Sequence, residues 1–284
     1  MAKIGVFDSG VGGLSVLREI VKLLPGESYV YFSDNAYCPY GEKEQSFIID
    51  RAREITDWML FKGVNIIVVA CNTATAAAIA TLREEYASPS ERVSRLTQGR
   101  TDHIKFIGME PAVKLATALT RSGVVGVLAT AGTLAGEKYK DNKIRWEGNT
   151  RIEEHVGEGF VELVESGETS GPHAEEVVRA SLQPLLDAGA DTIVLGCTHY
   201  PFLREVIQGI AGPDVQVIDP APAVARQLLR VIREEGIALS GATNDSAGGS
   251  APDANAPAGD FLFQSSGPRD ALDRLSHALF TLKR

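Results

Sequence analysis

The sequence predicts an α/β protein of two similar lobes, each a mainly parallel sheet flanked by helices. Short β-branched runs alternate with helical segments along the chain of 284 residues. The runs are apolar throughout, which is typical of parallel strands covered on both faces. Two of the runs end in the same kind of polar, cysteine-bearing corner, which indicates two lobes that face one another. Because ligands of open α/β sheets bind at the carboxyl ends of the strands, we expect the active site between the lobes.

Strands are expected at seven apolar runs, which are KIGVF (3–7), YVYFS (29–33), NIIVVA (65–70), KFIGM (105–109), GVVGVLA (123–129), TIVLG (192–196) and VQVID (215–219). Helices are expected at the amphipathic or alanine-rich stretches between them, such as residues 14–24, 46–63 and 174–190. Residues 261–282 predict a final strand and helix. Two polar segments predict insertions: residues 87–103 lack periodicity, and residues 243–260 have the composition of a mobile surface loop.

The two lobes are expected to alternate along the chain. The segments MEPAVKLATAL (109–119) and IDPAPAVARQL (218–228) both run from an apolar strand into an acidic residue, Pro-Ala and an amphipathic helix. This similarity hints at an internal repeat, although α/β units resemble each other by default. We expect a discontinuous first lobe of residues 1–103 and 213–284, and a second lobe of residues 104–212.

Composition and charge exclude several classes of protein. Hydrophobic residues make up 44% of the chain and charged residues 23%, as in soluble globular proteins. The net charge of −9 argues against a broad nucleic-acid surface. Three cysteines without regular spacing fit a reducing compartment better than a disulfide framework. The start, MAKIGVFDSG, lacks the apolar core of a signal peptide. We therefore expect a cytoplasmic protein with no membrane or nucleic-acid partner.

The first cysteine corner is VVACNTATAAA (68–78), where a strand meets Cys71 and an alanine-rich helix follows. Asn72 and Thr73 can cap that helix. Unpaired N–H groups at a helix start favour a thiolate and lower its pKa, and they also suit a bound carboxylate. The alternative for Cys71 is a small buried hydrophobic residue without chemistry.

The second cysteine corner is TIVLGCTHYP (192–201), which places Thr198, His199, Tyr200 and Pro201 after Cys197. Pro201 suits the first turn of a helix. His199 stands two residues from the thiol, where it could exchange a proton with a thiol or a substrate. The alternative is a histidine that is hydrogen-bonded for structure alone.

A glycine-rich turn, FDSGVGGLSVL (7–17), follows the first expected strand. Turns of this kind bind anions through backbone N–H groups. Ser15 stands where a dinucleotide-binding G-x-G-x-x-G motif requires glycine, so a nucleotide site is not indicated. Asp8, with Ser9 beside it, could hold the ammonium group of a zwitterion, or it could only form the turn.

The third cysteine, Cys38, precedes Pro39 in the turn-rich segment SDNAYCPYGEK (33–43), and we interpret it as structural. Tyr40 and Gly41 in the same segment could offer backbone groups to a ligand. No close cysteine pair such as C-x₂-C occurs, so no metal site is predicted.

Two thiols that face each other across a small substrate suit stereoinversion by two bases. One thiolate removes a proton from a carbon atom, and the other thiol delivers a proton to the opposite face. The pKa of a thiol can be set near working pH, where general acid–base catalysis is most effective.

The motifs FDSGVGGLSVL, SDNAYCPYGEK, VVACNTATA, LATAGTLAGEKY and VLGCTHYPFLR, in this order, resemble those of the bacterial glutamate racemases, members of the aspartate/glutamate racemase superfamily. The resemblance covers nearly the whole chain. It implies an isomerase that interconverts L- and D-glutamate with no cofactor and supplies D-glutamate for peptidoglycan biosynthesis. It also allows a homodimer.

The resemblance implies a role for each motif residue. Cys71 would be the base that acts on D-glutamate and Cys197 the base that acts on L-glutamate, with Asp8 and His199 as polar assistants. Glu165 matches a family acid near the second cysteine. The residues implied to hold the substrate are Asp8, Ser9, Tyr40, Gly41, Asn72, Thr73, Thr198 and His199.

Three other functions remain open at this point. The first is another racemase of the superfamily, such as one acting on aspartate, because pocket shape reads the length of the substrate side chain. A cysteine-dependent hydrolase or transferase would need one thiol and form a covalent intermediate. A non-catalytic amino-acid-binding protein would tolerate the loss of either thiol.

Overall fold

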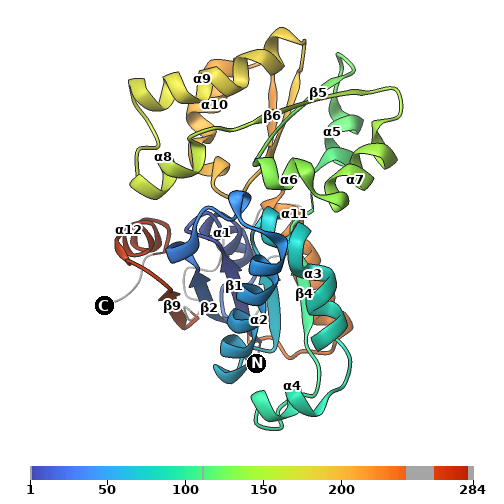
Figure 1. Ribbon diagram of the computed structural model, residues 1–284, viewed down its shortest axis with the longest axis vertical. Helices are drawn as coiled ribbons and strands as arrows, with labels where there is room; N and C mark the ends of the chain where they lie inside the picture. The colour runs from blue at the N-terminus through green and yellow to red at the C-terminus, as the bar shows by residue number, and fades with distance from the viewer. Residues whose placement is uncertain (1, 111, 241–258, 281–284) are drawn as a thin grey trace.

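The structure, a computed structural model, describes residues 2–110, 112–240 and 259–280. Two sheets, each with all of its strands parallel, form two lobes that lie one above the other in Figure 1. The predicted fold class is confirmed.

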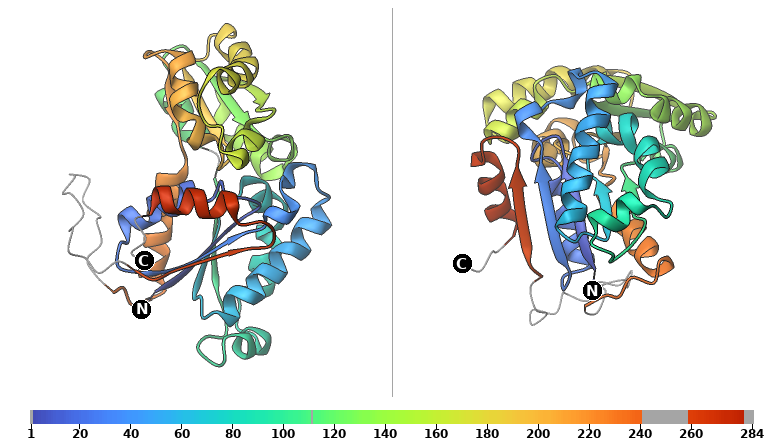
Figure 2. Two further views of the ribbon diagram at one scale, coloured as in Figure 1. Left: turned by 90° about the vertical axis from the view of Figure 1, so that its left-hand side faces the viewer. Right: turned by 60° about the horizontal axis from the view of Figure 1, so that its bottom comes forward.

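The first sheet has the strand order β4-β3-β1-β2-β9. Its strands are β1 (Lys3–Asp8), β2 (Ser28–Ser33), β3 (Ile66–Val69), β4 (Lys105–Gly108) and β9 (Phe261–Ser265). One face carries α1 (Leu14–Leu23), α11 (Ala221–Glu234) and α12 (Asp270–Leu279), and the other carries α2 (Gln45–Phe61) and α3 (Asn72–Tyr86). Figure 2 shows β9 and α12 together at the outer edge of this lobe.

The β3 strand shows why an unbroken apolar run forms the centre of this sheet. Successive side chains point to opposite faces, so Ile66 and Val68 pack with the α1 side while Ile67 and Val69 pack with α2 and α3. All four side chains are fully buried. Because the strand is covered on both faces, none of its side chains faces solvent, and all four are apolar.

The second sheet has the strand order β6-β5-β7-β8. Its strands are β5 (Val124–Ala129), β6 (Arg151–Val156), β7 (Thr192–Gly196) and β8 (Gln216–Ile218). One face carries α8 (Phe160–Ser166), α9 (Pro172–Asp187) and α10 (Arg204–Ala211), and the other carries α5 (Val113–Leu119) and α7 (Glu137–Glu147). The short helix α6 (Ala131–Ala135) lies at the junction of the lobes, beside the 3₁₀ turn η2 (Tyr40–Glu42) and α3.

The chain crosses between the lobes later than expected. Strand β4 is hydrogen-bonded to β3 of the first sheet, although residues 104–212 were assigned to the second lobe. Strand β8 is hydrogen-bonded to β7 of the second sheet, although residues 213–284 were assigned to the first lobe. Both expected boundaries therefore fall one strand too early, because strand pairing partners are not visible in the sequence. We propose that the lobes divide after β4 and after β8.

All seven expected strands and the three expected helices are present, as are the final strand β9 and helix α12. The edge strand β6 was missed because its sequence, RIEEHV, is polar and most of its residues are partly exposed. The segment 87–103 is not wholly irregular, since it contains α4 (Glu91–Leu96), which the Ser90 hydroxyl caps. Residues 243–258 of the predicted loop lie outside the described residues.

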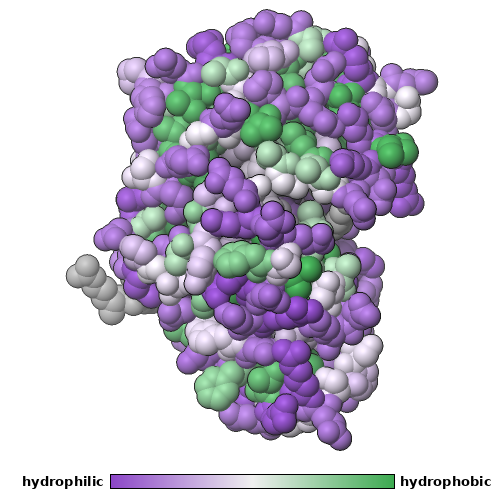
Figure 3. All heavy atoms as spheres, in the orientation of Figure 1, coloured by the Kyte–Doolittle hydropathy of each residue, from purple (hydrophilic) through white to green (hydrophobic). Residues whose placement is uncertain are grey.

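Polar and charged residues cover most of the face shown in Figure 3, with apolar residues scattered among them. In the described part of the chain, no helix is both long enough and apolar enough to cross a membrane.

Candidate active site

Both cysteine corners lie at the carboxyl ends of interior strands, one in each sheet. Cys71 follows β3 and caps α3, and Cys197 directly follows β7. Cys71 is 5% exposed and Cys197 is 7% exposed. The Asp8 carboxylate joins the two corners, since it accepts a hydrogen bond from Thr198 beside Cys197 and, together with burial, raises the pKa of Cys71. The two lobes thus bring both thiols into one buried site.

The Cys71 thiol lacks the lowered pKa that its helix corner predicts. Its Sγ accepts a hydrogen bond from the N–H of Ala74 at 3.4 Å and lies 3.7 Å from the hydroxyl oxygen of Ser9. These contacts lower the pKa, but burial raises it well above its usual range and the Asp8 carboxylate raises it further. The prediction was wrong because lost hydration outweighs two weak contacts in so closed a site. This environment therefore favours the thiol form of Cys71 over the thiolate.

A chain of contacts leads from Cys197 to Glu165 through His199. The Sγ atom of Cys197 lies 3.7 Å from Nδ1 of His199, and Nε2 of the same ring lies 2.7 Å from Oε1 of Glu165. A carboxylate only accepts hydrogen bonds, so Nε2 carries a proton and the ring is held with Nδ1 toward the thiol. Glu165, on α8, thus contacts His199, which in turn contacts Cys197. A role of Glu165 in catalysis stays a prediction.

The pKa shifts of His199 and Glu165 indicate a charged pair. Burial by itself would lower the pKa of His199, but the contacts with Cys197 and Glu165 raise it well above its ordinary value. Burial by itself would raise the pKa of Glu165, but the hydrogen bond with His199 outweighs it and lowers the pKa. Both directions favour an imidazolium beside a carboxylate.

Asp8 lies between the two corners. It is fully buried at the end of β1, and its Oδ1 accepts a hydrogen bond from the N–H of Ser9 at 2.7 Å. Its Oδ2 accepts from the N–H of Gly13 and, at 3.1 Å, from the hydroxyl of Thr198 in the second lobe. Burial raises the pKa of Asp8, although His199, the Cys71 thiol and the N–H groups of Gly13 and Ser9 oppose the rise.

The glycine turn after β1 allows the two lobes to approach closely. A Cβ on Gly12 would lie 2.4 Å from Nδ1 of His199, and a Cβ on Gly10 would lie 2.0 Å from Oε1 of Glu165. The N–H of Val11 donates to the same Glu165 oxygen at 2.8 Å. The N–H groups of the turn therefore bind two carboxylates of the protein itself, Asp8 and Glu165, and binding of a ligand anion there stays a prediction.

Three hydroxyl groups meet where α3 faces α6. The Oγ1 atoms of Thr73 and Thr130 are 3.1 Å apart, and those of Thr130 and Thr133 are 2.9 Å apart. The neighbouring Asn72 is buried, and its Nδ2 has no hydrogen-bond partner among the described residues. A buried amide without a partner is costly, which makes it a ready donor to a ligand. Thr130 and Thr133 are not among the predicted site residues, although both belong to the motif LATAGTLAGEKY.

The turn that contains Tyr40 and Gly41 closes against this hydroxyl cluster. A Cβ on Gly132 would lie 3.1 Å from the carbonyl oxygen of Gly41, so the two backbones are nearly in contact. Tyr40, Gly41, Thr73 and Gly132 are among the residues that line a pocket of about 350 Å³. Of the predicted ligand groups, Tyr40, Gly41 and Thr73 therefore face this pocket, and the residues of the second cysteine corner do not line it.

A buried ion pair anchors the same turn in the first lobe. Asp34 is fully buried, and Arg51 binds it with two donors, Nε at 2.9 Å and Nη2 at 2.7 Å. The hydroxyl of Tyr40 donates to Asp34 as well. Such a two-pronged pair fixes both distance and orientation, so Arg51 holds Tyr40 at the edge of the cavity.

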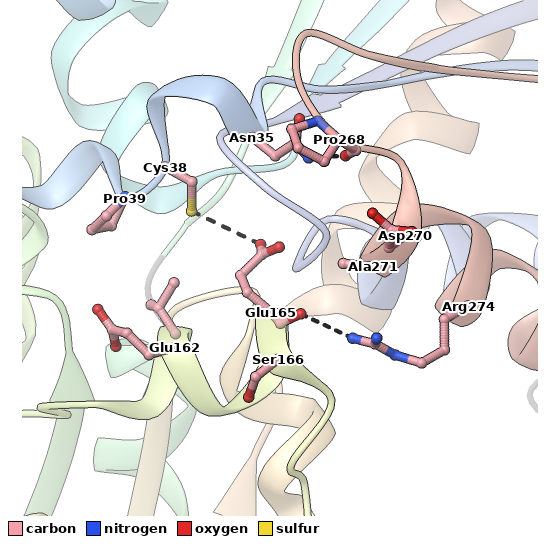
Figure 4. Close-up of a pocket in the computed structure, with 11 residues that line it drawn as sticks. Asn35, Cys38, Pro39, Glu162, Glu165, Ser166, Pro268, Asp270, Ala271 and Arg274 are labelled. Atoms are coloured by element: carbon pink, nitrogen blue, oxygen red, sulfur yellow. Dashed lines mark hydrogen bonds between the residues drawn. The ribbon is translucent and has the colours of Figure 1, made fainter.

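Cys38 lies close to Glu165, the residue that contacts His199 beside Cys197. The Sγ atom of Cys38 is 3.8 Å from Oε1 of Glu165, as the dashed line in Figure 4 shows. Cys38 is partly exposed, whereas Cys71 and Cys197 are buried. The interpretation of Cys38 as structural stays a prediction.

Known proteins are similar to this chain in sequence over most of its length. The profile of the Asp/Glu/Hydantoin racemase family matches residues 4–228. The glutamate racemase of Roseiflexus sp. (strain RS-1) is 45% identical over 234 residues, which is 82% of this chain and 80% of the relative.

Solved structures share the fold. Glutamate racemase isoform RacE1 from Bacillus anthracis superposes with a TM-score of 0.80 at 28% identity, over 99% of this chain and 95% of that one. Glutamate racemase from Francisella tularensis subsp. tularensis SCHU S4, in complex with D-glutamate, gives a TM-score of 0.73 at 26% identity, over 99% of this chain and 94% of that one.

Proposed function

The chain belongs to the Asp/Glu/Hydantoin racemase family and is an amino-acid racemase, and we propose that it interconverts L- and D-glutamate by two-base proton transfer without a cofactor. The placement of one thiol at the end of β3 and another at the end of β7 carries the proposal. The related structure that holds D-glutamate supports glutamate as the substrate.

Each thiol serves one face of the substrate carbon. From L-glutamate, the Cys197 thiolate takes the Cα proton and becomes a thiol, while the Cys71 thiol gives its proton to the opposite face and becomes a thiolate. The reverse sequence converts D-glutamate. His199 is the group placed to exchange a proton with Cys197, and Asp8 is the acid beside Cys71.

The polar groups near the two thiols suit the charges of an amino acid. Asn72 offers an amide donor, and Thr73 and Thr198 offer hydroxyl donors, for carboxylate oxygens. The substrate ammonium group would lie near Asp8, with Ser9, Tyr40 and Gly41 completing the enclosure. A cation beside Cys71 opposes the effect of burial, so substrate binding lowers the pKa of the Cys71 thiol.

Substrate access requires the lobes to move apart. Both thiols are less than one-tenth exposed, and the Thr198–Asp8 hydrogen bond spans the lobes beside them. Closure after binding excludes water from the carbon acid, which protects the carbanion-like intermediate from stray proton transfer.

The product, D-glutamate, would serve peptidoglycan biosynthesis in the cytoplasm, and with it cell-wall biogenesis and cell shape. A homodimer is part of the same proposal, and sedimentation equilibrium of the purified chain tests it.

The decisive experiment incubates the purified protein with each enantiomer of glutamate and of aspartate in D₂O, without pyridoxal phosphate or metal. Circular dichroism follows inversion, and NMR follows deuterium at Cα. We expect inversion of both glutamate enantiomers with exchange at Cα. Faster inversion of aspartate would favour an aspartate racemase instead. A covalent adduct at one thiol would favour a hydrolase or transferase, and binding without exchange would favour a non-catalytic protein.

A further inference from the structure

Three side chains of different chemistry meet at the edge of the proposed active site. Cys38 precedes the η2 turn, Glu165 comes from α8 and His199 follows β7. The thiol sulfur of Cys38, a carboxylate oxygen of Glu165 and a ring nitrogen of His199 all lie within 4.8 Å of one another. Neither base of the proposed reaction belongs to this trio.

This set of atoms matches the ligands of a catalytic-type zinc site. Zinc takes thiolate sulfur, imidazole nitrogen and carboxylate oxygen, and three protein ligands leave a fourth position for water. Zinc–ligand bonds of about 2.0 to 2.3 Å place neighbouring ligand atoms roughly 3 to 4 Å apart. Nε2 of His199 is 2.7 Å from Oε1 of Glu165, and Sγ of Cys38 is 3.8 Å from that oxygen. Small side-chain rotations would therefore suffice.

A pocket of about 440 Å³, shown in Figure 4, opens beside the trio. Cys38 and Glu165 both line it, and in the figure their side chains point toward one another. The carboxylates of Glu162 and Asp270 also line the pocket, against the single cation of Arg274. The wall is thus net acidic, which favours a divalent cation.

We propose that Cys38, Glu165 and His199 form an inhibitory site for a zinc-like divalent cation. Binding forms bonds from the metal to Sγ of Cys38, a carboxylate oxygen of Glu165 and Nε2 of His199. The thiol proton of Cys38 and the Nε2 proton of His199 leave to solvent, and a water from the pocket takes the fourth position. No electron transfer is involved.

Inhibition follows from the position of His199, and this step rests on the proposed function. A metal on Nε2 replaces the hydrogen bond between the His199 ring and Glu165. The remaining proton of the ring is then on Nδ1, beside Cys197. The imidazole can then no longer take a proton from that thiol and pass it on. Turnover stops in both directions, while Cys71 and Cys197 are themselves untouched.

The first test measures binding and does not depend on activity. Co²⁺ is titrated into the apo protein, and the thiolate-to-cobalt absorption in the near ultraviolet is recorded. We expect the band in the wild type and in Asp270→Asn, which alters the same pocket without removing a ligand. We expect Cys38→Ser and Cys38→Ala to lose it. A band of equal intensity in either Cys38 variant would mean that other thiols bind the metal, and it would overturn the proposal, as would no band in the wild type.

The second test measures inhibition of glutamate racemisation by Zn²⁺ alone. We expect Cys38→Ser to keep its turnover without metal. The variant should require at least about tenfold more zinc for half-inhibition, because even the loss of a group that only hydrogen-bonds to a metal ligand lowers metal affinity by about that factor. Asp270→Asn should change this concentration less than Cys38→Ser does. Equal zinc sensitivity in Cys38→Ser and the wild type would reject the site. If no variant racemises glutamate at all, the proposed function fails, and the cobalt titration still decides whether the metal site exists.

Discussion

The hydroxyl of Thr198, in the second lobe, donates a hydrogen bond of 3.1 Å to Oδ2 of Asp8, in the first lobe. Both residues are buried, and each adjoins one of the two cysteine corners. The contact therefore joins the two lobes beside both cysteine corners.

Replacing either base should abolish racemisation, because one face of the carbon then has no proton carrier. We expect Cys71→Ser and Cys197→Ser each to lower kcat by at least about 10³-fold, since a hydroxyl is a poor acid at neutral pH. Cys38→Ser is the control and should keep most of the turnover. With β-chloroglutamate, each variant should still expel chloride from one enantiomer, and that enantiomer should differ between the two variants. Elimination from the same enantiomer in both would contradict the two-face assignment.

Removing the partner of His199 should lower its pKa. The contact with Glu165 helps raise that pKa above the usual value near 6.5, so Glu165→Gln should move the titration of this ring to lower pH. NMR titration of the ring protons of the five histidines measures this directly. Glu168→Gln, which removes the partner of the exposed His173, is the matched control and should leave the His199 signal in place.

The pKa shifts of His199 and Glu165 also determine how folding stability depends on pH. The raised pKa of His199 means that its share of folding stability is present at low pH and is lost as the pH rises through the folded-state pKa. The lowered pKa of Glu165 means that its share is present above pH 4.5 and is lost as the pH falls. Urea unfolding of the wild type and Glu165→Gln should therefore differ most between these limits. An equal difference at pH 4 and pH 7 would argue against the ion pair.

Arg51→Met should destabilise the fold by about 3 kcal/mol, because it leaves the buried Asp34 carboxylate without its cation. Glu54→Gln removes the exposed partner of the same guanidinium and should cost no more than about 0.5 kcal/mol. Urea unfolding of both variants makes the comparison. Similar losses in the two variants would show that burial of Asp34 does not control the pair.

Gly12→Ala and Gly209→Ala should change stability in opposite directions. A Cβ at Gly12 meets the His199 ring at 2.4 Å, so we expect a loss of at least about 2 kcal/mol from overpacking and a large loss of turnover. A Cβ at Gly209, inside α10, meets nothing within 4 Å, so we expect a gain of up to about 1 kcal/mol from reduced unfolded-state entropy. Thermal unfolding separates them. Unchanged activity in Gly12→Ala would show that the lobes do not close on this turn.

Extensive dialysis against a chelator should leave racemisation intact, because the proposed bases are thiols and need no Lewis acid or pyridoxal phosphate. The measurement is turnover of D-glutamate before and after dialysis, with and without added Zn²⁺. Added zinc should only inhibit. Activity that is lost on dialysis and returns with zinc would refute a metal-independent mechanism.

The sequence by itself determined the α/β class, the strands and the two cysteine corners. These are local features: an unbroken β-branched run such as residues 66–69 is typical of a strand covered on both faces, and a cysteine shortly after it is expected at the carboxyl edge of a sheet. The family motif VLGCTHYPFLR is equally local, so the resemblance alone implies a site role for His199.

Only the tertiary structure decided which strands share a sheet and what surrounds each thiol. The pairing of β4 and β8 depends on hydrogen bonds between segments far apart in the chain, which leave no trace in either segment. The pKa of Cys71 depends on its burial in the folded protein, which outweighs the helix start beside it. Positions 10 and 12 have no room for a Cβ atom because Glu165 and His199, more than 150 residues away in the sequence, lie against them. In each case the deciding partner comes from another part of the sequence, and local propensity carries no information about a partner that folding brings from elsewhere in the chain.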